Sequence, residues 1–80
     1  MANIKIRYFA LLKDEAQISD EELNTDLKSY RELYDYLKER HDFSLPNGQI
    51  QVAVDDEYCQ MDFPIKDNGQ VVFIPPVSGG

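Results

Sequence analysis

The last six residues of the chain have the types and the order that suit a reactive carboxyl group. They are Pro75, Pro76, Val77, Ser78, Gly79 and Gly80. Because glycine has no Cβ, a segment ending in two glycines can enter a narrow channel and bring its carboxyl group close to another protein's active site. The two prolines stiffen the base of the segment and hold it off the preceding domain. The alternative is a frayed chain end without a function.

Other residues that can do chemistry do not gather into a recognisable site. The single cysteine, Cys59, has no partner for an internal disulfide, and we expect a half-buried thiol. His41 lies where a helix is expected to end, and a histidine there can interact with the exposed backbone carbonyl groups. We therefore do not expect it to bind a metal. The acidic groups 20–22 and 55–57 are interpreted as solvated loops. We therefore predict no metal site and no permanently bound cofactor.

The composition limits the classes of function. With 80 residues and 9.3 kDa, the chain makes one small domain with little room for an enclosed active site. The formal net charge of -7 argues against nucleic acid or an anionic membrane as partner, and it permits a basic protein partner. The lone cysteine favours a cytoplasmic location. Since the sequence has no apolar run of ~18 residues and no export signal, we expect no membrane span.

The first half of the chain predicts two strands. Residues 4–9 alternate between apolar and other side chains, which is typical of a strand with one buried face. Residues 10–19 have no clean period and are interpreted as a turn or loop. Residues 22–27 alternate again and are interpreted as a second strand at the edge of a sheet.

One helix follows. Ser29 and Glu32 have the capping-box spacing, in which the hydroxyl accepts from a free backbone N–H and the carboxylate reaches back to the cap. We expect the helix to fade near His41 and to bury one apolar stripe, which consists of Tyr30, Leu33, Tyr34 and Leu37.

The second half predicts more strands and turns. Residues 50–55 alternate and form a third strand, and a short fourth strand lies around Tyr58. Composition predicts turns at 45–48 and at 67–69. The final strand, 70–74, is rich in β-branched and aromatic residues and stops at the two prolines, which cannot donate to a ladder.

This order of elements favours an α+β fold, a ubiquitin-like β-grasp with a mixed sheet and one main helix packed on one face. In such a roll the first and last strands lie side by side in the centre. The expected organisation is a domain of residues 1–74 and an extended tail of residues 75–80. A ferredoxin-like sandwich is the alternative, but it needs a second helix that the pattern does not show.

Alternation also predicts an exposed apolar patch. If Tyr8 and Phe73 face the helix, then Phe9, Val72 and Ile74 face the other way, and the pairing of the first and last strands brings them together. Tyr58 is added to this candidate partner interface. An apolar patch on so acidic a chain suggests a protein interface, and cover by loops is the alternative.

Over nearly the whole length of the chain, the sequence resembles the family of the small, sulfur-carrier subunit of molybdopterin synthase. The specific string is Phe73-Ile-Pro-Pro-Val-Ser-Gly-Gly80, supported by Ile4-Lys-Ile-Arg-Tyr-Phe-Ala10, by Leu11-Leu-Lys-Asp14 and by Val52-Ala-Val-Asp55. Related carriers of thiamine synthesis share the two glycines but usually lack the Pro-Pro-Val-Ser lead-in. Lys13 and Asp14 depart from the family's usual Arg-Glu, and Asp55 from its usual Asn.

The resemblance implies a mechanism. An adenylating enzyme similar to those that activate ubiquitin would use ATP to adenylate the carboxylate of Gly80, and a sulfur donor protein would convert it to a thiocarboxylate. The carrier would then dock on the large synthase subunit in a heterotetramer and give its sulfur to cyclic pyranopterin monophosphate. By this reading the chain is not catalytic alone and acts as half of a transferase.

Three alternatives remain open from the sequence. A carrier for thiamine synthesis or for tRNA thiolation would share the tail and differ in its partner. A ubiquitin-like modifier would attach Gly80 to lysines of other proteins. A plain interaction module would not use Gly80 covalently.

Overall fold

The computed structural model describes residues 1–76, and its elements follow the predicted order except for a short helix after the first strand. In chain order they are β1 (Ala2–Tyr8), α1 (Leu11–Ala16), β2 (Asp20–Thr25), α2 (Tyr30–His41), the 3-10 helix η1 (Asn47–Gln49), β3 (Gln51–Val54), β4 (Glu57–Cys59) and β5 (Gln70–Ile74).

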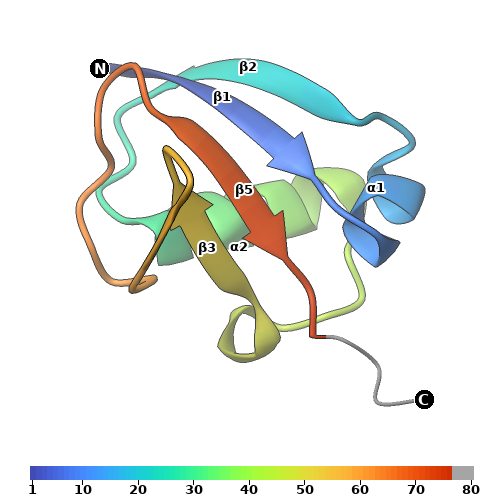
Figure 1. The fold of residues 1–80 in the computed structure, drawn as a ribbon. Helices are drawn as coiled ribbons and strands as arrows, with labels where there is room; N and C mark the ends of the chain where they lie inside the picture. Colours follow the sequence, from blue (N-terminus) through green and yellow to red (C-terminus); the bar gives the residue numbers. More distant parts are fainter. Residues whose placement is uncertain (77–80) are drawn as a thin grey trace.

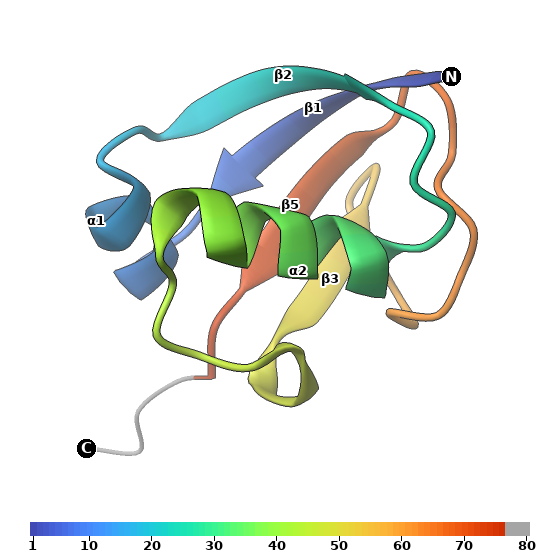
Figure 2. The same ribbon diagram turned by 180° about the vertical axis from the view of Figure 1, so that it is seen from behind.

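The strands form one mixed sheet in the order β2-β1-β5-β3-β4. Figure 1 labels β2, β1, β5 and β3 in this order. β1 and β5 run parallel in the centre, with Tyr8 opposite Phe73, and the other neighbouring strands are antiparallel. α2 crosses one face of the sheet (Figure 2). This confirms the predicted β-grasp, including the central position of the first and last strands. The ferredoxin-like alternative is wrong, because the additional helix α1 has only six residues.

The predicted apolar stripe packs α2 on the sheet. Its four residues are buried, and Leu33 and Leu37 have no exposed surface. They meet the inward side chains of β1, β3 and β5, which include Ile6, Val52 and Phe73. Burial of aliphatic and aromatic side chains is the main favourable term in folding, so this layer holds the helix in place.

Both ends of α2 are capped. Ser29 is the N-cap, and its hydroxyl accepts a hydrogen bond of 3.2 Å from the backbone N–H of Glu32. The Glu32 carboxylate accepts from the N–H of Lys28, one residue before the cap, at 3.2 Å. At the other end Asp42 adopts a left-handed conformation, and its N–H donates to the carbonyl of Lys38. The hydroxyl half of the predicted capping box and the predicted end near His41 are confirmed, whereas the Glu32 carboxylate bonds the N–H of Lys28 and not that of the cap residue Ser29.

Removal of the cap is expected to lower stability. In Ser29→Ala the N–H of Glu32 loses its acceptor, which should cost about 1 kcal/mol of unfolding free energy by urea denaturation. Ser44→Ala, at an exposed serine outside any helix, is the matched control. Equal denaturation midpoints for the two variants would show that the cap contributes nothing.

The loop predicted for residues 10–19 is wrong in part, because α1 lies within it. The chain enters α1 through Ala10, whose φ of 51° is unusual for a residue with a Cβ. No side chain caps this helix, and Leu12 is its one buried residue. A helix of fewer than two turns with one buried residue has no repeating pattern of apolar side chains. Helix propensity and residue spacing therefore could not predict it.

The second strand begins and ends two residues earlier than predicted. Leu27 lies beyond its end, although it still packs against the core. The acidic group 20–22 is therefore not a loop. It forms the first half of β2, where Asp20 and Glu22 face outward and Glu21 faces the core side. Alternation fixes the face of each residue but not where a strand starts, which explains the error.

The turn predicted at 67–69 is confirmed, whereas the segment predicted as a turn at 45–48 runs into η1. Of the acidic group 55–57, predicted as a loop, Glu57 instead begins β4. Asp55 and Asp56 have φ of 52° and 72° and form the two-residue connection between β3 and the short β4. The Asp55 carboxylate accepts from the N–H of Gln70 at 3.0 Å, which joins this hairpin to β5. Asn68 has a φ of 62° in the turn before β5. Asp and Asn tolerate this region of backbone conformation better than other residues with a side chain.

Candidate functional site

The tail follows directly from the central strand β5. Pro75 is buried and Pro76 is exposed, so the first residue after the strand still packs on the domain. The other predicted tail residues lie outside the described part of the chain. They are Val77, Ser78, Gly79 and Gly80.

The outward face of the sheet holds the predicted interface residue Val72 at its centre. The register places Arg7 on one side of Val72 and Ala53 on the other, and Tyr58 lies beyond Ala53. Tyr58 is 72% exposed, whereas Val72 is half-buried. Neighbouring strands are ~4.8 Å apart, so Tyr58 stands about 10 Å from Val72 along this row. Sequence patterns of single strands could not reveal this row, because it depends on the register between strands.

Phe9 and Ile74 lie near each other at the end of the sheet where β1 and β5 stop. β1 ends at Tyr8, opposite Phe73, and Phe9 follows with 56% of its surface exposed. Its backbone carbonyl accepts from the N–H of Leu12 at 3.1 Å, so the turn into α1 fixes its position. Ile74 is half-buried. The structure thus places Phe9, Val72 and Ile74 on or beside the outward face and Tyr58 towards the edge of the sheet.

The outward face also carries charge. Beside Phe9 is an open hollow of about 350 Å³ that Arg7 and Lys13 help to line. Across the strands Arg7 lies opposite Asp20, and Lys5 lies opposite Glu22. Opposite charges in cross-strand positions stabilise the pairing of β1 with β2 modestly. The apolar patch is therefore bordered by charged residues on its β1 and β2 side.

A buried polar cluster lies behind this end of the sheet. The Tyr8 hydroxyl donates to the Glu21 carboxylate, and the Nε2 of His41 lies 2.7 Å from the same oxygen. Burial, and then the hydrogen bond to Glu21, raise the pKa of Tyr8. For Glu21, burial favours a higher pKa, but hydrogen bonds from Tyr8 and His41 and the charges of His41 and Arg40 outweigh it, so its pKa is lowered. Sequence patterns alone do not predict this cluster.

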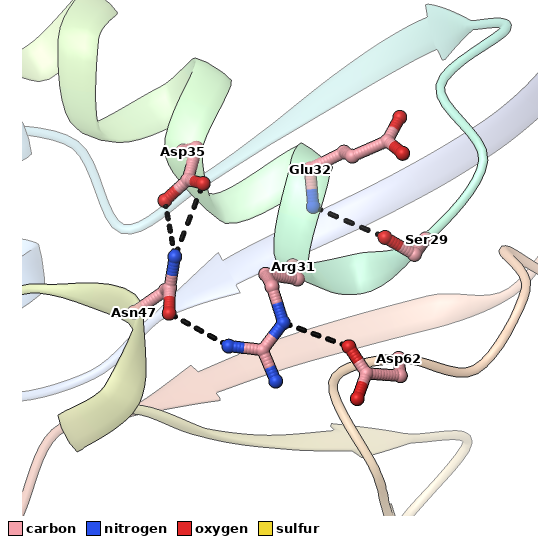
Figure 3. A network of polar contacts seen from close by, with 6 residues as sticks. All are labelled: Ser29, Arg31, Glu32, Asp35, Asn47 and Asp62. Carbon is pink, nitrogen blue, oxygen red and sulfur yellow. Dashed lines mark hydrogen bonds and ion pairs between the residues drawn. The ribbon is translucent and has the colours of Figure 1, made fainter.

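A second polar network fixes the loop that contains η1 (Figure 3). The Arg31 guanidinium donates to Asp62 at 2.7 Å and to the side-chain carbonyl of Asn47 at 2.8 Å. The Asn47 amide donates in turn to the Asp35 carboxylate at 2.8 Å. The hydrogen bond and charge of Arg31 lower the pKa of Asp62. Since β3 starts just after η1 and pairs with β5, the network supports the strand register beside the tail.

The other candidate chemical groups have ordinary positions. Cys59 is half-buried, as predicted, and burial raises the pKa of its thiol. Within residues 1–76 no three His, Cys, Asp or Glu side chains gather closely enough to hold a metal ion. Neither helix in this part of the chain has the length and apolar character needed to cross a bilayer.

A five-stranded roll with one main helix, whose central strand β5 leads into a Pro-Pro-Val-Ser-Gly-Gly segment, defines the class of small β-grasp proteins with a C-terminal tail. The model of the ThiS family matches residues 6–80, and the chain belongs to this family. The molybdopterin synthase sulfur carrier subunit of Escherichia coli (strain K12) is 28% identical in an alignment that covers 96% of this chain and 99% of that protein.

Solved structures share this fold. A protein named as molybdopterin converting factor subunit 1 of Pyrococcus furiosus has a TM-score of 0.77 and 25% identity, covering 96% of this chain and 100% of that one. Small archaeal modifier protein 1 of Haloferax volcanii has a TM-score of 0.76 and 20% identity over 99% of this chain and 100% of the other. A chain in the complex of subunits 1 and 2 of the Helicobacter pylori molybdopterin-converting factor has a TM-score of 0.65 and 22% identity. The match covers 98% of this chain and 99% of that one.

Proposed function

We propose that the chain is the sulfur carrier subunit of a molybdopterin synthase, with the carboxyl group of Gly80 as its reactive group. The observation that carries the proposal is the ThiS-family match, which extends through the tail to Gly80 on a confirmed β-grasp domain. The relative that matches nearly end to end is a molybdopterin synthase sulfur carrier subunit. The Pro-Pro-Val-Ser lead-in supports this carrier over one for thiamine synthesis.

The chemistry starts from an unreactive group. A carboxylate is a poor electrophile, because its oxygen leaves poorly. In the proposed first step an activating enzyme uses ATP, pyrophosphate leaves, and the Gly80 carboxyl becomes a mixed anhydride with AMP. Hydrosulfide (HS⁻) supplied by the sulfur donor then attacks the carbonyl carbon, a C–S bond forms as the C–O bond to AMP breaks, and a thiocarboxylate, AMP and a proton result. Two glycines offer no side chain to stabilise these steps, so the partner enzymes must supply the charged groups.

The proposed docking surface for the large subunit is the outward face around Val72 and Ile74, with Phe9 at its end and Tyr58 at its edge. An apolar centre with a charged border is typical of a protein interface. The complex formed by subunits 1 and 2 of the Helicobacter pylori factor supports a partner of this kind. Docking through this face would leave the tail free to enter the partner, because both meet at the end of β5.

The proposal is tested by intact-mass measurement after incubation with ATP, a sulfur source and the activating enzyme. Exchange of one oxygen for sulfur is the expected result. An adduct on other proteins would support a modifier, and an unchanged mass would support an interaction module. The thiocarboxylate form is then mixed with the purified large subunit and cyclic pyranopterin monophosphate, where molybdopterin should appear. Sulfur transfer only to a thiamine or tRNA system would assign one of the other carrier roles.

Phe9→Ala is expected to weaken docking on the large subunit by about 2 kcal/mol or more, because an aromatic anchor at an interface carries a large share of the binding energy. The fold should persist, since Phe9 is 56% exposed. Calorimetry measures the affinity and circular dichroism the fold. Tyr36→Ala is the matched control, because Tyr36 is an exposed aromatic residue on α2. Equal affinities for the two variants would place the interface elsewhere.

A further inference from the structure

Glu21 is an unusual residue on the core-facing side of β2. Its neighbours on that side are Leu23 and Thr25, which are half-buried and buried. The Glu21 side chain is only 12% exposed, and that of His41, its partner from α2, is 13% exposed. An ionisable side chain in such a place is costly unless partners satisfy it. Its position therefore calls for a structural reason.

The partners of the carboxylate come from two other elements. β1 supplies the hydroxyl of Tyr8, and α2 supplies His41 at 2.7 Å and the Arg40 guanidinium at 3.9 Å. These are the titratable and charged groups that contact Glu21 within residues 1–76. Phe43, in the loop after α2, packs beside both aromatic partners, with ring centres 5.6 Å from Tyr8 and 5.5 Å from His41. A hydrogen bond in a mostly buried site is electrostatically stronger than one in water.

The cluster ties together three elements at one end of the sheet. Tyr8 is the last residue of β1 and pairs with Phe73, one residue before β5 ends. Glu21 is the second residue of β2, and His41 is the last residue of α2. An edge strand is held by a neighbour on one side only, so its end depends on such side-chain contacts. The cluster thus secures the part of the domain next to the strand that leads into the tail.

We propose that Tyr8, Glu21 and His41 form an acid-sensitive latch, which holds the start of β2 and the last turn of α2 on the sheet while Glu21 is ionised and lets them open when Glu21 is protonated. Protonation removes the negative charge that faces the half-exposed Arg40 and the mostly buried His41. The latch is independent of sulfur transfer, so either proposal can fail without the other.

The direction of the pH effect follows from the carboxylate. The pKa of Glu21 is lower in the folded chain than its ordinary value, because the bonds and charges of its partners outweigh its burial. Its contribution to stability is therefore complete above the ordinary pKa of a glutamate, about 4.3. The contribution is lost as pH falls through the lower, folded value. Opening through Glu21 should accordingly occur in acid.

The test is amide hydrogen exchange by NMR on the full chain, at neutral pH and in acid. On acidification the protection factors of the first half of β2 and of the last turn of α2 should fall about tenfold more than those of the β3–β4 hairpin. Glu21→Gln keeps the size of the side chain but cannot ionise. Its β2 amides should already be less protected at neutral pH and should lose little more in acid.

Glu22→Gln is the matched control, because Glu22 lies on the exposed face of the same strand. This variant should lose stability in acid as wild type does. Part of that loss comes from Asp55 and Asp62, whose pKa values are lowered by Lys66 and Arg31 respectively. The same additional acid loss in Glu21→Gln and Glu22→Gln would overturn the latch.

Two further measurements make the test independent of how well Glu21→Gln folds. In Tyr8→Phe one hydrogen bond to the ionised form is lost, so opening should move to higher pH. In wild type the carbon-13 signal of the Glu21 carboxyl group should titrate together with the loss of protection. Titration of Glu21 without any change in the exchange of β2 would also overturn the proposal.

Discussion

Deletion of Gly80 is expected to abolish both adenylation and sulfur transfer. The deletion moves the terminal carboxyl group back by one residue, ~3.3 Å of extended chain. Reacting atoms must approach within about 3–3.5 Å, so the carboxylate should no longer reach the attacking or accepting group in either partner. The fold should be unchanged, because the hydrophobic core consists of residues between Ile4 and Phe73. Intact mass measures the first reaction, and molybdopterin formation with the purified large subunit measures the second.

A chain with one glycine added after Gly80 should fail for the opposite reason, and a bulky residue in place of Gly79 should block entry into the partner's channel. Glu39→Ala, at an exposed position of α2, is the control with an unaltered tail. It should accept and donate sulfur as wild type does. Full activity of the Gly80 deletion would end the sulfur-carrier proposal and leave the fold assignment intact.

Leu33→Ala is expected to lower the free energy of unfolding by about 2–5 kcal/mol. The Leu33 side chain has no exposed surface and lies in the layer between α2 and the sheet, so its truncation removes apolar burial and leaves a cavity. A domain of this size has a total stability of about 5–15 kcal/mol, which makes the expected loss a large fraction. The urea midpoint and the slope of the unfolding transition measure it.

Glu39→Ala again serves as the comparison, since it makes the same change to alanine on the exposed side of the same helix. Its midpoint should differ little from that of wild type, because surface substitutions rarely change stability by more than about 0.5 kcal/mol. If both variants unfolded at the same urea concentration, the stripe of α2 would not be the packing face.

The parts of the fold with a strong local signal could be predicted from the sequence. The apolar stripe and the Ser29–Glu32 box defined α2, and alternation defined β1, β3 and β5, because each period is set by the local backbone. α1 was missed because one buried leucine makes no period. β2 was placed two residues late because the contacts that fix its start lie on β1 and α2.

The candidate site divides in the same way. The exposed Phe9 and the half-buried Val72 and Ile74 could be predicted, because alternation alone decides which face a residue occupies. The row from Arg7 to Tyr58 could not, since it depends on the register of four strands. The cluster around Glu21 could not be predicted, because a carboxylate in an acidic run is expected to be exposed to solvent. Only the tertiary structure brings Tyr8 and His41 into contact with it.

The place of β5 in the sheet has a consequence for how the protein is made. β5 leaves the ribosome after β1 and β3, yet it lies between them, so neither half of the sheet has its neighbour until β5 has been made. Contacts between distant parts of a chain form slowly, and incomplete chains expose apolar surface. A nascent chain that stops before β5 therefore lacks both a folded domain and a tail. Quality control can recognise such a fragment as unfolded, so a tail is present only on chains that can complete the sheet.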